Sequence, residues 1–117
     1  MRGTVLPPHA VEKVREALAE DLGLGDLTSE LVVPEDAWAV AEIRAEGKGV
    51  LAGVEEACMA FELLGCRVLE SRRDGSRVRP GDVVLRVEGP ARALLAAERT
   101  ALNFLMRMSG IATATAR

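Results

Sequence analysis

The sequence predicts an α+β fold, an open sandwich in which a roughly four-stranded antiparallel sheet carries helices on one face and a long helix follows at the C-terminal end. The first observation is that helical segments alternate with short strands linked by glycine and proline turns, a pattern typical of antiparallel sheets. The second is size: 117 residues, 49% hydrophobic and 28% charged, are enough for a domain with a buried core. We therefore expect one domain over residues 1–117.

The first helix is predicted over residues 9–22, where apolar side chains recur at spacings of three and four. These side chains are Val11, Val14, Leu18 and Leu22. Prolines 7 and 8 suit the start of a helix, and glycines 23 and 25 are expected to end it. Three acidic residues surround that end, at Glu20, Asp21 and Asp26. Their spacing matches no calcium loop, so a capped turn is favoured over a metal site.

The longest predicted strand covers residues 37–46 and alternates strictly. Alanines and Ile43 lie on one face, and Trp38, Val40 and charged side chains lie on the other. The face of small residues is expected to pack against the core or a helix. Shorter strands are predicted at residues 50–53, 66–71, 76–78 and 83–88, with Asp-Gly and Pro-Gly turns at 74–75 and 80–81.

A second helix is predicted over residues 54–64, with its apolar face at Val54, Cys58, Phe61 and Leu64 and Gly65 as its C-terminal cap. The last helix is predicted to start after Pro90 and to cover residues 91–117. Its apolar stripe is predicted from Leu94, Leu95, Leu102, Leu105 and Met106. Glu98 and Ser109 point into the middle of that stripe, because a helix turns about 100° per residue.

Arg99 is the leading candidate for a binding residue, at the rim of this stripe with Arg92 and Asn103 on either side. A guanidinium in an Ala/Leu-rich helix is costly to bury unless it is paired. One interpretation is an ion pair between helices in a dimer or domain seam. The other is that Arg99 reaches a cleft and holds a carboxylate or phosphate, which its planar fork suits. Both hold if Glu98 is the structural residue and Arg99 the functional one.

Other functional groups are sparse, and no catalytic residue is expected in this chain. The single histidine, His9, is remote from any nucleophile. Cys58 and Cys66 are too few for a disulfide framework or a metal site and are expected to be buried thiols. A net charge of −3, spread along the chain, argues against nucleic acid and anionic membranes as partners. Without a signal peptide or a long apolar run, the chain is expected to be a soluble cytoplasmic protein.

Three segments together resemble the quinolinate phosphoribosyltransferase family, also called carboxylating nicotinate-nucleotide pyrophosphorylases. They are EDLGLGDLTS (20–29), EIRAEGKGVLAGVEEACMAFELLG (42–65) and DGSRVRPGDVVLRVEGPARALLAAERTALNFLMRMSGIATAT (74–115). The stretch 97–115 is the most specific. The resemblance covers nearly the whole chain, as the N-terminal sandwich domain of such an enzyme. Related phosphoribosyltransferases of the same two-domain type, including nicotinate-specific enzymes and molybdenum-transport-associated homologues, are the alternatives within this resemblance.

The resemblance implies an enzyme that makes nicotinate mononucleotide, carbon dioxide and pyrophosphate from quinolinate and phosphoribosyl pyrophosphate, with Mg²⁺, in NAD biosynthesis. Family members are dimers in which the N-terminal domain of one subunit covers the α/β barrel of the other. The arginine of the ERT motif, here Arg99, then binds a quinolinate carboxylate in trans, with Glu98, Asn103 and Arg92 in supporting positions. The barrel and the Mg²⁺ site fall outside this chain, which alone is expected to be inactive.

The C-terminal sequence Ala-Thr-Ala-Arg lacks a helix stop signal, so we expect the chain to continue into a longer polypeptide. The alternative is a stand-alone carrier-like or protein-interaction module. Residues 74–89 look like the paired turns of biotinyl and lipoyl carriers, but they contain no lysine to modify. A third possibility is self-association through the apolar stripe of the last helix.

Overall fold

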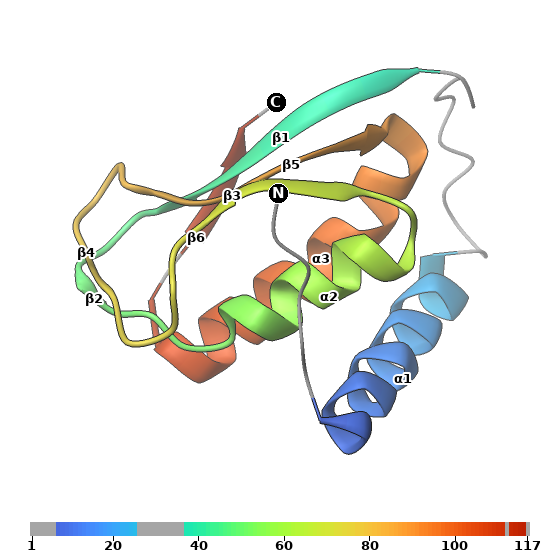
Figure 1. Cartoon of the computed structure of the whole chain (residues 1–117), viewed down its shortest axis with the longest axis horizontal. Coiled ribbons are helices and arrows are strands. Elements are labelled where there is room, and N and C mark those ends of the chain that lie inside the picture. Colours follow the sequence, from blue (N-terminus) through green and yellow to red (C-terminus); the bar gives the residue numbers. More distant parts are fainter. Residues whose placement is uncertain (1–6, 26–36, 112, 117) are drawn as a thin grey trace.

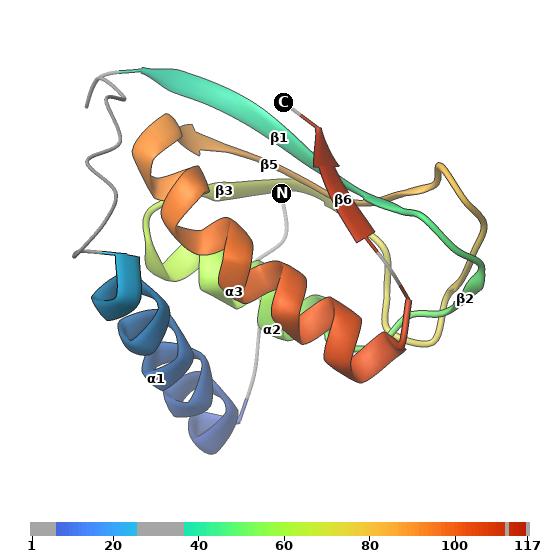
Figure 2. The ribbon, with the colours of Figure 1, turned by 180° about the vertical axis from the view of Figure 1, so that it is seen from behind.

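A four-stranded antiparallel sheet, covered on one face by helices, organises this computed structural model (Figures 1 and 2). The structure describes residues 7–25, 37–111 and 113–116. The sheet order is β3-β5-β1-β6, with bounds β1 (Trp38–Ala45), β3 (Arg67–Ser71), β5 (Val83–Pro90) and β6 (Thr113–Ala116). The α+β fold class is therefore confirmed.

The helices form two further layers. Helices α2 (Val54–Leu63) and α3 (Ala91–Ser109) run side by side beneath the sheet, and α1 (Pro8–Gly25) packs on both of them, away from the sheet (Figure 1). Val14 and Leu18 are the buried contacts of α1, as its periodicity predicts. The helix begins at Pro8 and runs through Gly25, so the prediction that it ends at Leu22 is three residues too short. The side chains of the acidic cluster at 20–26 lie outside the described residues.

Strand β1 shows the predicted alternation. Ala41, Ile43 and Ala45 are buried on the helix side, whereas Trp38 is 62% exposed on the other face. Because alanine projects only a methyl group, α3 can lie close to β1 and still contact β5. The core between these layers is filled by large side chains that are fully buried, among them Phe61, Ile43, Leu51, Leu85, Leu94 and Leu105.

The C-terminal stretch differs from the prediction of one helix over residues 91–117. Helix α3 ends at Ser109, and Gly110 takes the left-handed conformation (φ 70°) with its N–H bonded to the Met106 carbonyl at 3.0 Å. Glycine reaches this conformation without steric cost, so it is a stop signal inside the predicted helix. The chain then forms β6, which pairs antiparallel with the second half of β1. The prediction of a helix is therefore wrong for residues 113–116, which form the fourth strand of the main sheet.

Two of the predicted strands leave the main sheet and form a separate ribbon. It consists of β2 (Gly49–Val50) and β4 (Arg77–Val78), paired antiparallel. The predicted strand at 50–53 is wrong beyond Val50, since residues 51–53 lead directly into α2 and Gly53 precedes that helix at φ 85°. The Pro-Gly turn next to the ribbon is confirmed, with Gly81 at φ 92°.

Candidate functional site

Helix α3 carries two different apolar faces. The buried one consists of Leu94, Ala97, Ala101 and Leu105, which repeat at spacings of three and four and pack into the core. Leu95 and Leu102 are only half-buried, and Met106 is 39% exposed. The single apolar stripe predicted for this helix therefore combines residues of a buried face with residues of a partly exposed one. Leu95, Leu102 and Met106 line an open depression on the outer side of α3, and Leu102 also packs against the edge of the core. Figure 2 shows α3 in front of α2 on the near side of the molecule.

Arg99 lies on this outer face, at the edge of the strip formed by Leu95, Leu102 and Met106 and away from the buried residues, as its predicted place at the rim of the broad stripe requires. At about 100° per residue it projects roughly opposite to the buried face. Its side chain is exposed and lines a shallow, open depression together with Leu95, Leu102 and Met106. Among the residues that the structure describes, no hydrogen bond or ion pair involves the Arg99 side chain. Its forked guanidinium is thus presented to solvent on a partly apolar surface.

The three supporting candidates lie close to Arg99 along the helix. Glu98 is half-buried and Asn103 stands one turn after Arg99, and both line the same depression. Arg92 is exposed two turns before Arg99, outside the depression. Glu98 and Arg92 each take part in interactions of their own. The Arg99 guanidinium and the Asn103 amide, surrounded by apolar side chains, can together bind a carboxylate or phosphate.

Ser109 has a structural role that the sequence analysis missed. Its Oγ accepts a hydrogen bond from the Ala52 N–H at 2.8 Å and donates one to the Ala52 carbonyl at 2.6 Å. The end of α3 is thereby tied to the loop that leads into α2. Glycine at position 53 allows this approach, since a Cβ there would lie 2.8 Å from the Phe104 carbonyl oxygen. These contacts fasten the C-terminal end of α3, whose length is otherwise held by its buried face. The available sequence signal was Gly110 directly after Ser109, which marks Ser109 as the last residue of the helix.

Other reactive side chains are separated from this face. His9 is exposed in the first turn of α1. Cys58 and Cys66 are buried free thiols, as predicted, and burial raises the pKa of Cys66 to about 11, so it stays protonated at neutral pH. Within residues 7–25, 37–111 and 113–116, no three His, Cys, Asp or Glu side chains come together as metal ligands. In the same part of the chain, no helix has the length and apolar character needed to cross a bilayer.

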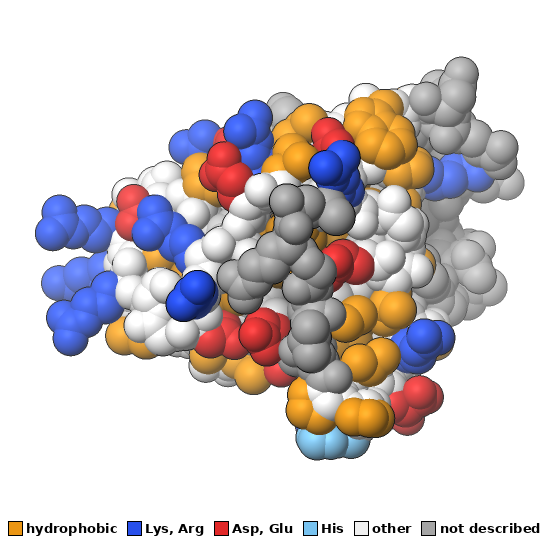
Figure 3. All heavy atoms as spheres, viewed as in Figure 1, with side chains coloured by type: hydrophobic (Ala, Val, Ile, Leu, Met, Phe, Trp, Pro, Cys, Tyr) orange, Lys and Arg blue, Asp and Glu red, His pale blue; other side chains and the backbone are white. Residues whose placement is uncertain are grey.

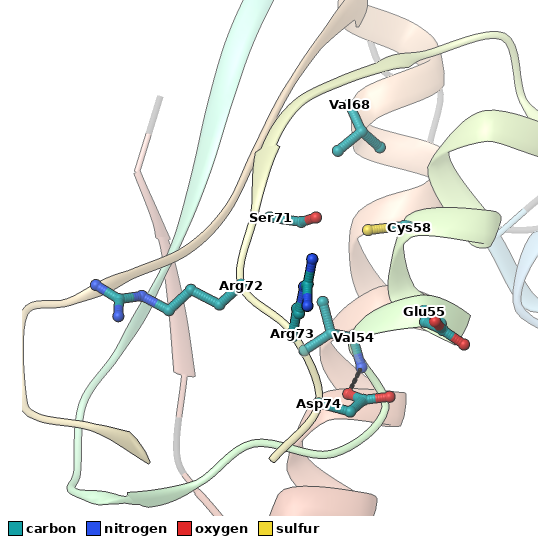
Figure 4. Close-up of a pocket in the computed structure, with 8 residues that line it drawn as sticks. All are labelled: Val54, Glu55, Cys58, Val68, Ser71, Arg72, Arg73 and Asp74. Atoms are coloured by element: carbon teal, nitrogen blue, oxygen red, sulfur yellow. Dashed lines mark hydrogen bonds between the residues drawn. The ribbon is translucent and has the colours of Figure 1, made fainter. Parts of the chain in front are cut away.

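A second depression lies at the N-terminal end of α2 and contains Cys58 and Ser71 (Figure 4). One oxygen of Asp74 accepts a hydrogen bond from the Val54 N–H at 2.8 Å, drawn as a dashed line in Figure 4. This carboxylate caps α2 from a distant turn, because Gly53 has no side chain to do so. Arg73 points into the depression and Arg72 points away from it. The Asp-Gly turn therefore lies against the start of α2, and Asp74 serves as the cap of that helix.

Comparison with known proteins gives consistent matches. Residues 26–109 match the family described as "Quinolinate phosphoribosyl transferase, N-terminal domain". The chain is 50% identical over 93 residues to a probable nicotinate-nucleotide pyrophosphorylase (carboxylating) of Archaeoglobus fulgidus, covering 80% of this chain and 34% of that protein. It is 41% identical over 111 residues to the nicotinate-nucleotide pyrophosphorylase (carboxylating) of Mycobacterium leprae, covering 91% of this chain and 39% of the relative.

Solved structures agree with these matches. The nicotinate-nucleotide pyrophosphorylase of Francisella tularensis superposes with a TM-score of 0.74 at 30% identity, over 88% of this chain and 38% of that one. NadC of Streptococcus pyogenes gives the same TM-score at 32% identity, over 86% and 38%. This chain therefore spans little more than a third of the length of the relatives it matches.

Proposed function

This chain belongs to the quinolinate phosphoribosyl transferase family, in which it matches the N-terminal domain, and we propose that it covers the active site of a neighbouring subunit. The proposed complete enzyme converts quinolinate and phosphoribosyl pyrophosphate to nicotinate mononucleotide, carbon dioxide and pyrophosphate in NAD biosynthesis. The name shared by the A. fulgidus and M. leprae relatives supports this reaction. The barrel that performs the chemistry lies outside residues 1–117 in this proposal, and the chain alone is inactive.

The observation that carries the proposal is the state of Arg99. Its guanidinium is exposed, makes no ion pair with any described residue, and stands among Leu95, Leu102 and Met106. Once a partner surface covers these apolar side chains, water is removed from around the cation and its attraction for an anion increases. A fork of two parallel N–H donors then suits one carboxylate of quinolinate.

The outer face of α3 has a second role in the proposal. Its half-exposed apolar side chains form the contact with the neighbouring subunit, which makes the proposed enzyme a homodimer. Its proposed location is the cytoplasm. Asn103, one turn from Arg99, supports the bound carboxylate, and Glu98 and Arg92 flank the site on the same helix. Mg²⁺ is held by residues outside this chain. The described residues supply no cluster of three metal ligands, and no step here depends on the ion.

The test replaces Arg99 in the full-length enzyme. A hydrogen bond to a charged group contributes about 1.5–3 kcal/mol, so R99A should lower kcat/KM for quinolinate roughly 10- to 100-fold. R99K keeps the charge but lacks the planar fork and should recover only part of the loss. Arg107→Ala is the matched control, an exposed arginine in the last turn of the same helix that lines a different depression.

Sedimentation of each variant reports whether the dimer persists. We expect R99A to stay dimeric with a raised KM and reduced turnover, and R107A to behave as the unmodified enzyme. Unchanged quinolinate kinetics in a dimeric R99A enzyme would remove Arg99 from the site.

A further inference from the structure

The β2–β4 ribbon has an inner and an outer face. Val78 is buried on the inner face, and a Cβ at position 49 would lie 2.9 Å from the Ile111 side chain. The neighbouring positions must therefore point outward, because successive strand residues alternate. Val50 and Arg77 are paired across the ribbon and exposed, and Lys48, Val50, Arg77 and Arg79 line one open depression. Figure 3 shows Lys and Arg side chains gathered at this end of the molecule, where Figure 1 places β2 and β4.

The cations of this outer face, Lys48, Arg77 and Arg79, outnumber the one carboxylate among the described residues that line the same depression, that of Asp82. Within the described residues, no ion pair involves the side chains of Lys48, Arg77 or Arg79. Asp82 lines the same depression, but its carboxylate accepts a hydrogen bond from the backbone N–H of Arg79 at 2.8 Å and stands 4.0 Å from Arg72. Like charges on one strand face repel each other. Three such cations on a chain with net charge −3 form a local positive surface that complements an anionic partner.

Backbone pairing in and beside the ribbon fixes the main chain from which these cations project. Two backbone hydrogen bonds join the segments that flank the paired residues of β2 and β4. One runs from the Leu51 N–H to the Ser76 carbonyl and the other from the Gly81 N–H to the Ala45 carbonyl, each at 2.8 Å. Arg79 follows directly after β4, two residues beyond Arg77, and an extended backbone over this step places their Cα atoms roughly 6.6 Å apart. Carboxylates at alternate positions of an extended peptide repeat at the same distance. Val50, which is 51% exposed between the cations, offers an apolar contact to the same peptide.

We propose that the outer face of the ribbon, defined by Lys48, Val50, Arg77 and Arg79, docks an extended acidic segment of a partner protein. The two arginine forks bind carboxylates at alternate positions of that segment. The depression is open and not enclosed, which suits a ligand spread along the ribbon. This surface is distinct from the outer face of α3, and the proposal does not depend on the enzyme activity.

The experiment measures fluorescence anisotropy of a fluorescein-labelled octapeptide with glutamate and serine at alternate positions, at 50 mM salt. We expect R77E/R79E to weaken binding at least tenfold. K13E/R15E is the matched control, with the same charge change at exposed positions two residues apart on α1, and should stay within twofold of the unmodified chain. Raising the salt to 300 mM should weaken binding to the unmodified chain, since exposed charges are screened.

R77Q/R79Q, which removes both charges without reversing them, is a second variant in case R77E/R79E fails to fold, and its binding should also fall. Thermal unfolding of every variant checks the fold. Failure of the peptide to bind, or equal loss in the α1 control, would overturn the proposal. A tighter complex with inorganic pyrophosphate than with the peptide would overturn it as well, because the surface would then be a small-anion site.

Discussion

The hydrogen-bond pair between Ser109 and Ala52 permits a quantitative test of what positions α3. Ser109→Ala removes an acceptor at 2.8 Å and a donor at 2.6 Å and leaves both backbone groups of Ala52 without these partners. Each intramolecular hydrogen bond contributes about 0.5–1.5 kcal/mol net to stability. Ala52 is half-buried, so water replaces part of the loss. We therefore expect the free energy of unfolding to fall by about 1–2 kcal/mol.

Urea unfolding, followed by circular dichroism, measures this change. The urea concentration at the midpoint should fall, while the slope of the unfolding free energy against urea concentration should stay the same. In a thermal scan the same loss corresponds to a decrease in Tm of roughly 4–8 °C for a chain of this size. Ser76→Ala is the matched control, because Ser76 is also half-buried and engages the fold through its backbone and not through its hydroxyl. If Ser109→Ala were no more destabilising than Ser76→Ala, the tie to Ala52 would not hold α3 in place.

Two further changes test other contacts. Asp74→Ala removes the cap on the Val54 N–H and should lower the free energy of unfolding in urea by about 1 kcal/mol. Asp74→Asn keeps an acceptor oxygen and should cost less. Equal losses in the two variants would show that the cap on α2 is not the source of the stabilisation. For Cys66, burial favours the neutral thiol, so its pKa of about 11 lies above that of the unfolded chain. The contribution of the neutral Cys66 thiol to the free energy of unfolding is fully present at neutral pH and should be lost as the pH rises from about 9 to 11. Urea midpoints measured across that range report this loss. A Cys66→Ala chain with the same pH dependence would show that it has another origin.

Local pattern was sufficient for much of the fold. The alternation of β1 predicted which of its faces is buried, and the periodicity of α1 predicted Val14 and Leu18 as core residues. The Asp-Gly and Pro-Gly pairs predicted the turns at which Gly75 and Gly81 take positive φ values. These features depend on a few neighbouring residues and on backbone sterics, so they can be read without knowing what packs where.

The error at α3 has a physical cause. A leucine that faces the core and a leucine on the outer side of a helix contribute to the same periodicity, so residues 94–106 gave one broad stripe where the structure has two faces. Helix periodicity identifies apolar positions but not what covers them. Only the packing of α2 and the sheet separates the buried face with Leu94 and Leu105 from the outer face with Leu95 and Met106.

The sequence by itself determined the fold class, the family resemblance and the candidate Arg99, because all three depend on residue identities in short, continuous segments. The tertiary structure decided that Arg99 is exposed among half-buried apolar side chains, that residues 113–116 pair with β1, and that Lys48 lies on the same ribbon face as Arg77 and Arg79. These juxtapositions join positions far apart along the chain. They follow from strand pairing and layer packing, which no local pattern specifies.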